Sequence, residues 1–327
     1  MAERLSILAG TLAIALVGAD PAVRAAEPPA VVASIGPIHS LVAGVMGEIG
    51  QPTLLVEGAA SPHDYGMKPS DAIHLQAADL VFWIGPNLET FLAKPITMVR
   101  SDARVVALAE VDGLTLYPTR EGGTWEAHRH EHAEDGEQTH GSAEASDHHD
   151  DHARTDLHLW LDPTNAIVMT RAIAAALSAA DPGNAPAYQA HAAEQEERLK
   201  ALDQELEARL GPVRERPFIV FHDAYQYFER RYDLAAAGAI TIGPERAPGA
   251  KRLQEIHQRL AASDAVCVFS EPQFEPAVIE TVVEGTDART GVLDPLGAGL
   301  EPGPGLYPRL LSDLTESLVD CLDPTRS

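Results

Sequence analysis

One uninterrupted helical segment in the middle of the chain constrains the fold more than any other feature. Residues 186–210 consist almost entirely of Ala, Glu, Gln, Leu, Lys and Arg, with no Gly and with no Pro after the first position. Leucines recur at helical spacing at Leu199, Leu202, Leu206 and Leu210, which predicts one long amphipathic helix. On both sides of it, short apolar runs typical of strands alternate with helical patterns. We therefore predict two α/β blocks, each with a parallel sheet covered by helices.

The apolar runs place the expected strands, and the length of the chain sets the number of domains. The runs before the helix are residues 30–36, 53–56, 80–84 and 104–108, and those after it are residues 218–221, 239–242, 265–269 and 291–293. For a chain of 327 residues, two domains are the natural expectation. The long helix is then a rigid connector between two lobes or a surface helix within one lobe, and its pattern alone fits both.

The N-terminus has the pattern of an export signal. Arg4 precedes the apolar residues 5–17, and the small side chains of Val23 and Ala25 suit a cleavage site after residue 25. We expect a cleaved signal peptide at residues 1–25 and a periplasmic protein, with an uncleaved anchor as the alternative. The apolar run is shorter than the about 20 residues that span a membrane, and no other stretch is long and apolar enough, so we expect no direct insertion into the membrane.

Two cysteines are present, Cys267 and Cys321. An even number in an exported chain favours a disulfide over two buried free thiols. Such a bond would attach the C-terminal helix to an interior strand.

A histidine-rich, acidic segment interrupts the first block. Residues 126–152 hold seven histidines, nine carboxylates and one Arg, with hardly any apolar residue. The histidines are His128, His130, His132, His140, His148, His149 and His152. Because this segment cannot bury a core, we expect a mobile, solvated loop that captures or senses metal with low affinity; an acidic loop that binds metal only incidentally is the alternative. The formal net charge of −25 likewise favours cations and argues against nucleic acid as a partner.

Three histidines are expected near strand ends, where open α/β sheets place their ligands. His63 lies in a polar turn after the second expected strand, and His222 directly follows a buried strand. His158 lies within residues 156–163, where apolar and polar side chains alternate and predict an extended segment. Asp294 follows the last strand in a matching position. Three neutral imidazoles with at most one oxygen form a tetrahedral set that Zn²⁺ accepts, although ligands spread this widely fit no short zinc motif.

A series of short motifs runs in order along nearly the whole mature chain. They are residues 59–65 (AASPHDY), 68–71 (KPSD), 77–80 (AADL), 158–163 (HLWLDP), 220–225 (VFHDAY), 269–274 (FSEPQF) and 293–297 (LDPLG). Together they resemble the metal-binding receptors of ABC transporters, and the periplasmic zinc receptors of that family in particular. The resemblance implies an α/β fold of two Rossmann-like lobes, residues 26–183 and 212–327, bridged by one long helix at 184–211. It places the metal in the cleft between the lobes.

The resemblance also implies a function and a set of ligands. Such a receptor captures Zn²⁺, its transported ligand, with high affinity and delivers it to the membrane permease of a zinc ABC importer. We expect a monomer without enzymatic activity. The motif histidines map onto His63, His158 and His222, and the disulfide of the family maps onto Cys267 and Cys321.

The third histidine separates the competing functions. Manganese and iron members resemble this plan but have a carboxylate where His222 stands, so an imidazole there favours Zn²⁺, with a manganese- or iron-type receptor as the alternative. A zinc hydrolase with three histidines and an open metal position is the candidate from another class. Against it, the chain has no His-Glu-x-x-His motif, no nucleophile elbow and no Gly-rich phosphate loop.

The sequence leaves the remaining positions around the metal open. Some zinc members have Glu just before the first histidine as a further ligand, whereas this chain has Pro62. The fourth ligand is then water or Asp294. Metal-bound imidazoles usually donate their other N–H to an oxygen, which makes the nearby Asp64, Asp162 and Asp223 candidates; surface or capping roles are the alternative for these three.

Overall fold

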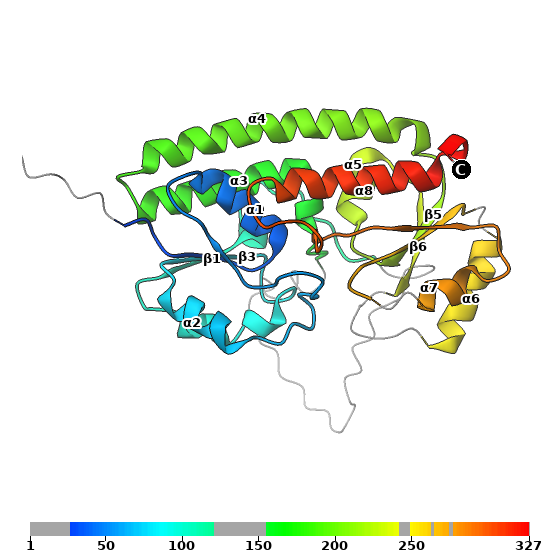
Figure 1. The fold of residues 1–327 in the computed structure, drawn as a ribbon, viewed down its shortest axis with the longest axis horizontal. Coiled ribbons are helices and arrows are strands. Elements are labelled where there is room, and N and C mark those ends of the chain that lie inside the picture. Colours follow the sequence, from blue (N-terminus) through cyan, green and yellow to red (C-terminus); the bar gives the residue numbers. More distant parts are fainter. Residues whose placement is uncertain (1–26, 121–154, 242–248, 263–264, 275–276, 327) are drawn as a thin grey trace, which may run out of the picture.

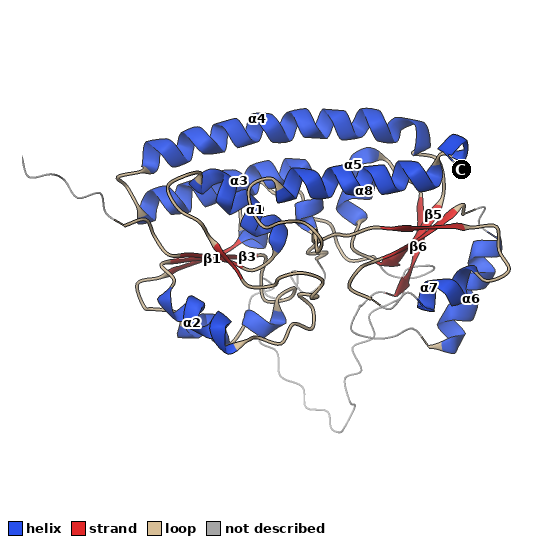
Figure 2. Cartoon of the chain, viewed as in Figure 1, coloured by secondary structure: helices blue, strands red, loops and turns tan. Residues whose placement is uncertain are grey.

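Two α/β lobes lie below a layer of long helices in the computed structural model (Figures 1 and 2). The structure describes residues 27–120, 155–241, 249–262, 265–274 and 277–326. The signal peptide expected at residues 1–25 and the histidine-rich loop at 126–152 lie outside the described residues.

Each lobe contains a four-stranded parallel sheet, and the two sheets have the same strand order, β2-β1-β3-β4 and β6-β5-β7-β8. The first lobe is built from β1 (Val31–Ala33), α1 (Gly36–Met46), β2 (Thr53–Leu54), α2 (Pro69–Ala77), β3 (Leu80–Trp83), β4 (Arg104–Ala107) and α3 (Pro163–Ala180). The second is built from β5 (Phe218–His222), α5 (Gln226–Tyr232), β6 (Ala236–Thr241), α6 (Ala250–Ala262), β7 (Cys267–Ser270), α7 (Ala277–Val283), β8 (Arg289–Val292) and α8 (Leu306–Leu322). Short 3₁₀ turns occur at Thr90–Leu92, Pro95–Met98, Leu108–Glu110, Leu159–Leu161, Gly211–Val213 and Pro324–Arg326. In both sheets the strand order reverses between the first and third strands of the lobe, where open α/β sheets bind ligands.

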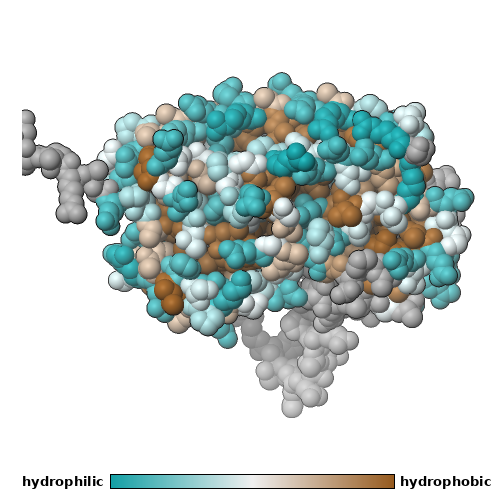
Figure 3. Space-filling model, in the orientation of Figure 1, coloured by the Kyte–Doolittle hydropathy of each residue, from teal (hydrophilic) through white to brown (hydrophobic). Residues whose placement is uncertain are grey.

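Helix α4 (Ala185–Leu210) is the long helix that the sequence predicts, and it extends over both lobes (Figure 1). Its buried side chains recur every three or four residues and include Tyr188, Ala192, Gln195, Leu199, Leu202, Leu206 and Leu210. Its outer face is largely hydrophilic (Figure 3). Helix α8 is a second connection between the lobes. At its start, Tyr307 N donates to Ser40 Oγ at 2.9 Å and Tyr307 Oη donates to Trp160 O at 2.7 Å, so this helix of the second lobe begins on the first.

Each sheet packs against apolar side chains on both of its faces. Alternate side chains of a strand point into the layers on opposite sides of the sheet. In β5, Phe218 and Val220 belong to the core under the long helices, while Ile219 and Phe221 belong to the cluster formed with α6 and α7. Strands β1 and β3 alternate in the same way between the long helices and α2. The core under the helices is continuous across both lobes. His222 ends β5 and continues the alternation on the face of Phe218 and Val220.

The predicted disulfide is confirmed. Cys267 at the start of β7 is bonded to Cys321 in the last turn of α8, with a Cα–Cα distance of 6.1 Å. No helix in the described part of the chain combines the length and the apolar composition that crossing a membrane requires.

Candidate metal centre

His63 is presented by the loop between β2 and α2, and that loop is braced on its neighbours. The Tyr65 hydroxyl lies 3.1 Å from Leu55 O and 3.0 Å from Asp71 Oδ2. Asp71, in the first turn of α2, also accepts from Lys68 N at 2.7 Å. These hydrogen bonds fix the backbone directly after His63 and so restrict the position of its imidazole.

His158 is held by a carboxylate two residues earlier in the chain. Asp156 Oδ1 accepts from His158 N at 3.0 Å and lies 2.8 Å from His158 Nδ1. The extended segment predicted here is wrong: Leu159–Leu161 form a 3₁₀ turn whose three side chains are all buried. The turn leads into α3, where Asp162 is the N-cap and accepts from Thr164 N at 2.7 Å.

His222 meets a carboxylate from the neighbouring strand. Glu271 directly follows β7, which pairs with β5 in the sheet. Its two oxygens lie 2.6 and 2.8 Å from His222 Nδ1. Both residues are only 3% exposed. Because β5 and β7 flank the point at which the strand order reverses, their carboxyl ends bring these two side chains together.

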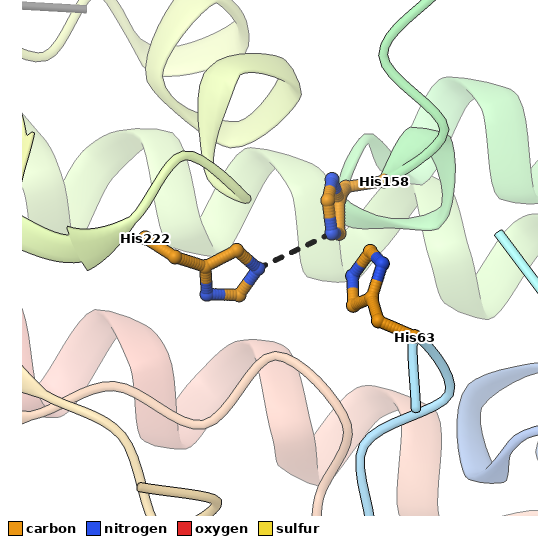
Figure 4. A group of neighbouring side chains, drawn as sticks. All are labelled: His63, His158 and His222. Atoms are coloured by element: carbon orange, nitrogen blue, oxygen red, sulfur yellow. Dashed lines mark hydrogen bonds between the residues drawn. The ribbon is translucent and has the colours of Figure 1, made fainter. Parts of the chain in front are cut away.

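The three imidazoles converge from three separate segments (Figure 4). Within the described residues they are the one group of three or more His, Cys, Asp or Glu side chains that could share a metal. One ring nitrogen from each lies within 4.8 Å of the other two. His158 Nε2 and His222 Nε2 are 3.4 Å apart. Two nitrogens bound tetrahedrally to zinc at about 2.0–2.1 Å lie roughly 3.3–3.4 Å apart. The rings of His158 and His222 therefore already have the spacing of zinc ligands, and His63 lies close enough to complete the set.

The two carboxylates decide which ring nitrogens are available. Asp156 and Glu271 each accept an Nδ1 proton, which leaves the Nε2 atoms of neutral His158 and His222 as lone pairs. Two lone pairs 3.4 Å apart repel, so a cation or a shared proton between them would stabilise the contact drawn in Figure 4. His63 Nε2 is also buried and has no hydrogen-bond partner among the described residues. The facing Nε2 atoms of His158 and His222 and the unpaired Nε2 atom of His63 all suit a bound cation.

Burial and charge shift the pKa values of two ligands in opposite directions. Burial lowers the pKa of His63 well below 6.5, and charge on His158 and His222 lowers it further. Burial also lowers the pKa of His222, but attraction to Glu271 and the hydrogen bond with it outweigh burial, so the pKa of His222 is raised. His63 is therefore ready to bind metal at neutral pH, whereas His222 keeps its proton to a higher pH than an ordinary histidine and must release that proton to bind metal.

The comparisons with known proteins decide what kind of chain carries this centre. Residues 31–321 match the family model described as zinc-uptake complex component A, periplasmic. The chain belongs to this family. The high-affinity zinc uptake system protein ZnuA of Brucella abortus (strain 2308) is 50% identical over 317 residues, covering 91% of this chain and 93% of that protein. The protein of the same name from Yersinia pestis is 38% identical over 314 residues, covering 95% of this chain and 96% of that protein.

Solved structures share the fold of this zinc-uptake component. A crystal structure of a ZnuA deletion mutant with zinc bound has a TM-score of 0.71 and 24% identity, and the match covers 90% of this chain and 98% of that one. A manganese-bound periplasmic metal binding protein from Candidatus Liberibacter asiaticus has a TM-score of 0.71 and 22% identity, with 90% and 99% covered. At these identities the likeness concerns the fold alone, which accommodates zinc in one protein and manganese in the other.

The aspartates expected to orient the ligands take other roles in this family member. Asp64 is exposed, Asp162 caps α3, and Asp223 belongs to a buried ion pair. The rings of His158 and His222 are held by Asp156 and Glu271 instead, two carboxylates that the sequence patterns do not single out. The sequence offers a clue to Glu271, because this residue lies in one of the family motifs directly after an expected strand. The clue to Asp156 is weaker and consists only of its position two residues before a ligand.

Asp294 lies after β8, but its carboxylate is engaged in a turn. Its Oδ1 accepts from Leu296 N and Gly297 N at 3.0 Å each, and its Oδ2 accepts from Ala298 N at 2.6 Å. Gln273 Nε2 also donates to Oδ1 at 3.1 Å. Asp294 thus stands outside the group of imidazoles that the described residues form. The seven loop histidines between residues 126 and 152 lie outside the described residues.

Proposed function

We propose that this zinc-uptake component captures Zn²⁺ with high affinity in the periplasm and hands it to the membrane permease of a zinc ABC importer. The observation that carries the proposal is the third imidazole. His222 forms a cluster with His63 and His158 and lies at zinc spacing from His158, in a position where a carboxylate would favour manganese or iron. In this proposal water is the fourth ligand, because the oxygens of Asp294 already accept hydrogen bonds from four donors.

The electrostatics of the centre support a divalent cation as cargo. Glu271, Asp223 and Asp156 all act on His222 strongly enough to raise its pKa against the effect of burial. The same negative field attracts Zn²⁺ more strongly than it attracts a proton, because the ion carries twice the charge.

Burial supports a receptor over a hydrolase. His158 and His222 are 8% and 3% exposed, and the free nitrogen of His63 is buried. A catalytic zinc keeps a position open to substrate, whereas these nitrogens are enclosed between the lobes. We therefore assign no catalytic residue.

Export and auxiliary capture belong to the same proposal. We infer that residues 1–25 are a cleaved signal peptide, that the mature protein acts as a monomer, and that residues 126–152 gather zinc with low affinity.

The experiment is a chelator-competition titration of the mature protein, residues 26–327, with Zn²⁺. We expect one tight site that is lost in His63→Ala and in His158→Ala. His74→Ala is the control, because His74 is an exposed histidine on α2. Restored growth on chelated medium, in cells that lack their own zinc receptor but keep the permease, would test delivery. Wild-type affinity in the two ligand variants would refute the proposed site.

A further inference from the structure

Residues 114–120 run between the lobes and are anchored on both. On the side of the first lobe, Asn165 of α3 accepts from Thr115 N at 2.8 Å and donates to Thr115 O at 3.0 Å. On the side of the second lobe, Gln226 Nε2 of α5 donates to Pro118 O at 3.0 Å. This segment therefore fixes α5 relative to α3.

Arg120 ends the segment, and its guanidinium lies between two carboxylates of the second lobe. Its Nε is 3.0 and 3.1 Å from the oxygens of Asp223, and its terminal nitrogens contact both Asp223 and Glu229 of α5. The side chains of Arg120, Asp223 and Glu229 are 16%, 9% and 5% exposed. Water screens such a cluster only weakly, so removing the cation would leave two buried carboxyl groups without the donor that they share.

The cluster of Arg120, Asp223 and Glu229 is connected to two of the metal ligands, His158 and His222. Asp223 is the residue directly after His222. The helix that carries the second carboxylate also carries Gln226, whose Nε2 is 3.2 Å from Asp156 Oδ2. The other oxygen of Asp156 holds the ring of His158 at 2.8 Å. The position of α5 against the first lobe therefore affects where the imidazoles of both His158 and His222 lie.

From this arrangement we propose that Arg120 is a positioning residue for the metal centre. By holding Asp223 and Glu229 against the first lobe, it sets the 3.4 Å separation of the His158 and His222 nitrogens before metal binds. The inference rests on the proposed function, because its readout is metal binding. Without the guanidinium, Asp223 and Glu229 lose the donor that ties them to residues 114–120, α5 shifts against the first lobe, and the imidazoles lose the spacing that zinc needs.

The test compares Arg120→Met with a matched control on the same helix. Arg231 of α5 also pairs through two nitrogens with one buried carboxylate, that of Asp203 on α4, but this pair joins α5 to the long helix. We expect R120M to weaken zinc affinity about tenfold, at the lower end of the range for residues that orient metal ligands, and R231M to change it less than about twofold. Thermal melts of the metal-free variants measure their general loss of stability separately.

A spectroscopic readout separates positioning from stability. Tetrahedral Co²⁺ absorbs visible light more strongly than Co²⁺ of higher coordination number, so we expect R120M saturated with Co²⁺ to lose absorption relative to wild type and R231M. R120K should recover part of both readouts, since it keeps the charge but not the fork of donors, and it replaces R120M should that variant fail to fold.

The outcomes are distinct. A wild-type protein without a tight zinc site would overturn the proposed function and this inference with it. A tight wild-type site together with an unchanged R120M, or with an R231M equally impaired in both readouts, would overturn the role of Arg120 alone.

Discussion

Glu271→Gln perturbs the contact through which the second lobe orients its metal ligand, His222. Glu271 is 3% exposed, and its oxygens lie 2.6 and 2.8 Å from Nδ1 of His222. Gln keeps the shape and one acceptor oxygen but removes the charge. A charge-assisted hydrogen bond is about twice as strong as a neutral one, so the imidazole becomes both a weaker base and a less firmly held ring.

The size of the effect follows from what orienting residues contribute to metal sites. Replacing such a residue lowers metal affinity about 10–100-fold, which is about 1.4–2.7 kcal/mol at about 1.4 kcal/mol per tenfold change. Because Gln retains an acceptor, we expect E271Q near the lower limit, roughly tenfold, and E271A near the upper limit, roughly 100-fold. Competition with a chelator of known zinc affinity, at constant pH, measures both dissociation constants.

Glu89→Gln is the matched control, because Glu89 occupies the corresponding reversal point of the first sheet. It is fully buried and accepts from Ser34 Oγ at 2.5 Å, Ile84 N at 3.0 Å and Gly85 N at 2.9 Å. An amide NH₂ cannot accept a hydrogen bond, so E89Q should lower the melting temperature while zinc affinity stays unchanged. Wild-type zinc affinity in E271Q, or an equal loss in E89Q, would refute the idea that Glu271 acts through the imidazole.

Zinc affinity should also depend on pH, because the raised pKa of His222 keeps that ring protonated above its usual 6.5 in the metal-free protein. Zinc affinity should fall as pH decreases through the raised pKa, and the metal-free fold should lose stability as pH rises through it. Zinc titrations and thermal melts between about pH 8 and about pH 5.5 measure these two effects. Flat pH profiles would speak against the raised pKa. Deleting residues 126–152 should spare the tight site but lower the amount of Zn²⁺ bound at saturation, and an unchanged stoichiometry would rule out a binding role for the loop. Cys321→Ser opens a cross-link between residues 54 apart and should lower the free energy of unfolding by about 4 kcal/mol in denaturant titrations. Zinc affinity should survive that change, since the bond lies at the opposite end of β7 from the metal centre, and a large loss would contradict this separation.

Local sequence patterns predicted most of the fold. The leucines of α4 and the apolar run of β5 carry strong periodic signals, and both elements lie within a few residues of the predicted bounds. The segment around His158 failed because its alternation of Leu with polar side chains suggested two faces. Packing between the lobes buries Leu159, Trp160 and Leu161 alike, so a 3₁₀ turn satisfies the same pattern.

The carboxylates around the metal depend on information that the local pattern does not hold. Asp64 and Asp223 are the neighbours of ligands in sequence, yet Glu271 reaches His222 only because β7 lies beside β5 in the sheet. Strand order is a property of the whole lobe, and without it the adjacent residue is the natural choice. Asp156 holds His158 through a local turn in which Asp156 Oδ1 also accepts from His158 N, a geometry that the alternating pattern does not specify.

Competition between Zn²⁺ and Mn²⁺ for the mature protein, with His222→Ala measured beside wild type, tests the central claim most directly. The three-imidazole centre predicts one tight Zn²⁺ site that Mn²⁺ does not displace at equal concentration, and a sharp loss of zinc affinity in H222A. Equal or tighter binding of Mn²⁺, or an H222A variant that binds zinc as well as wild type, would contradict the assignment of the ligands and of the metal.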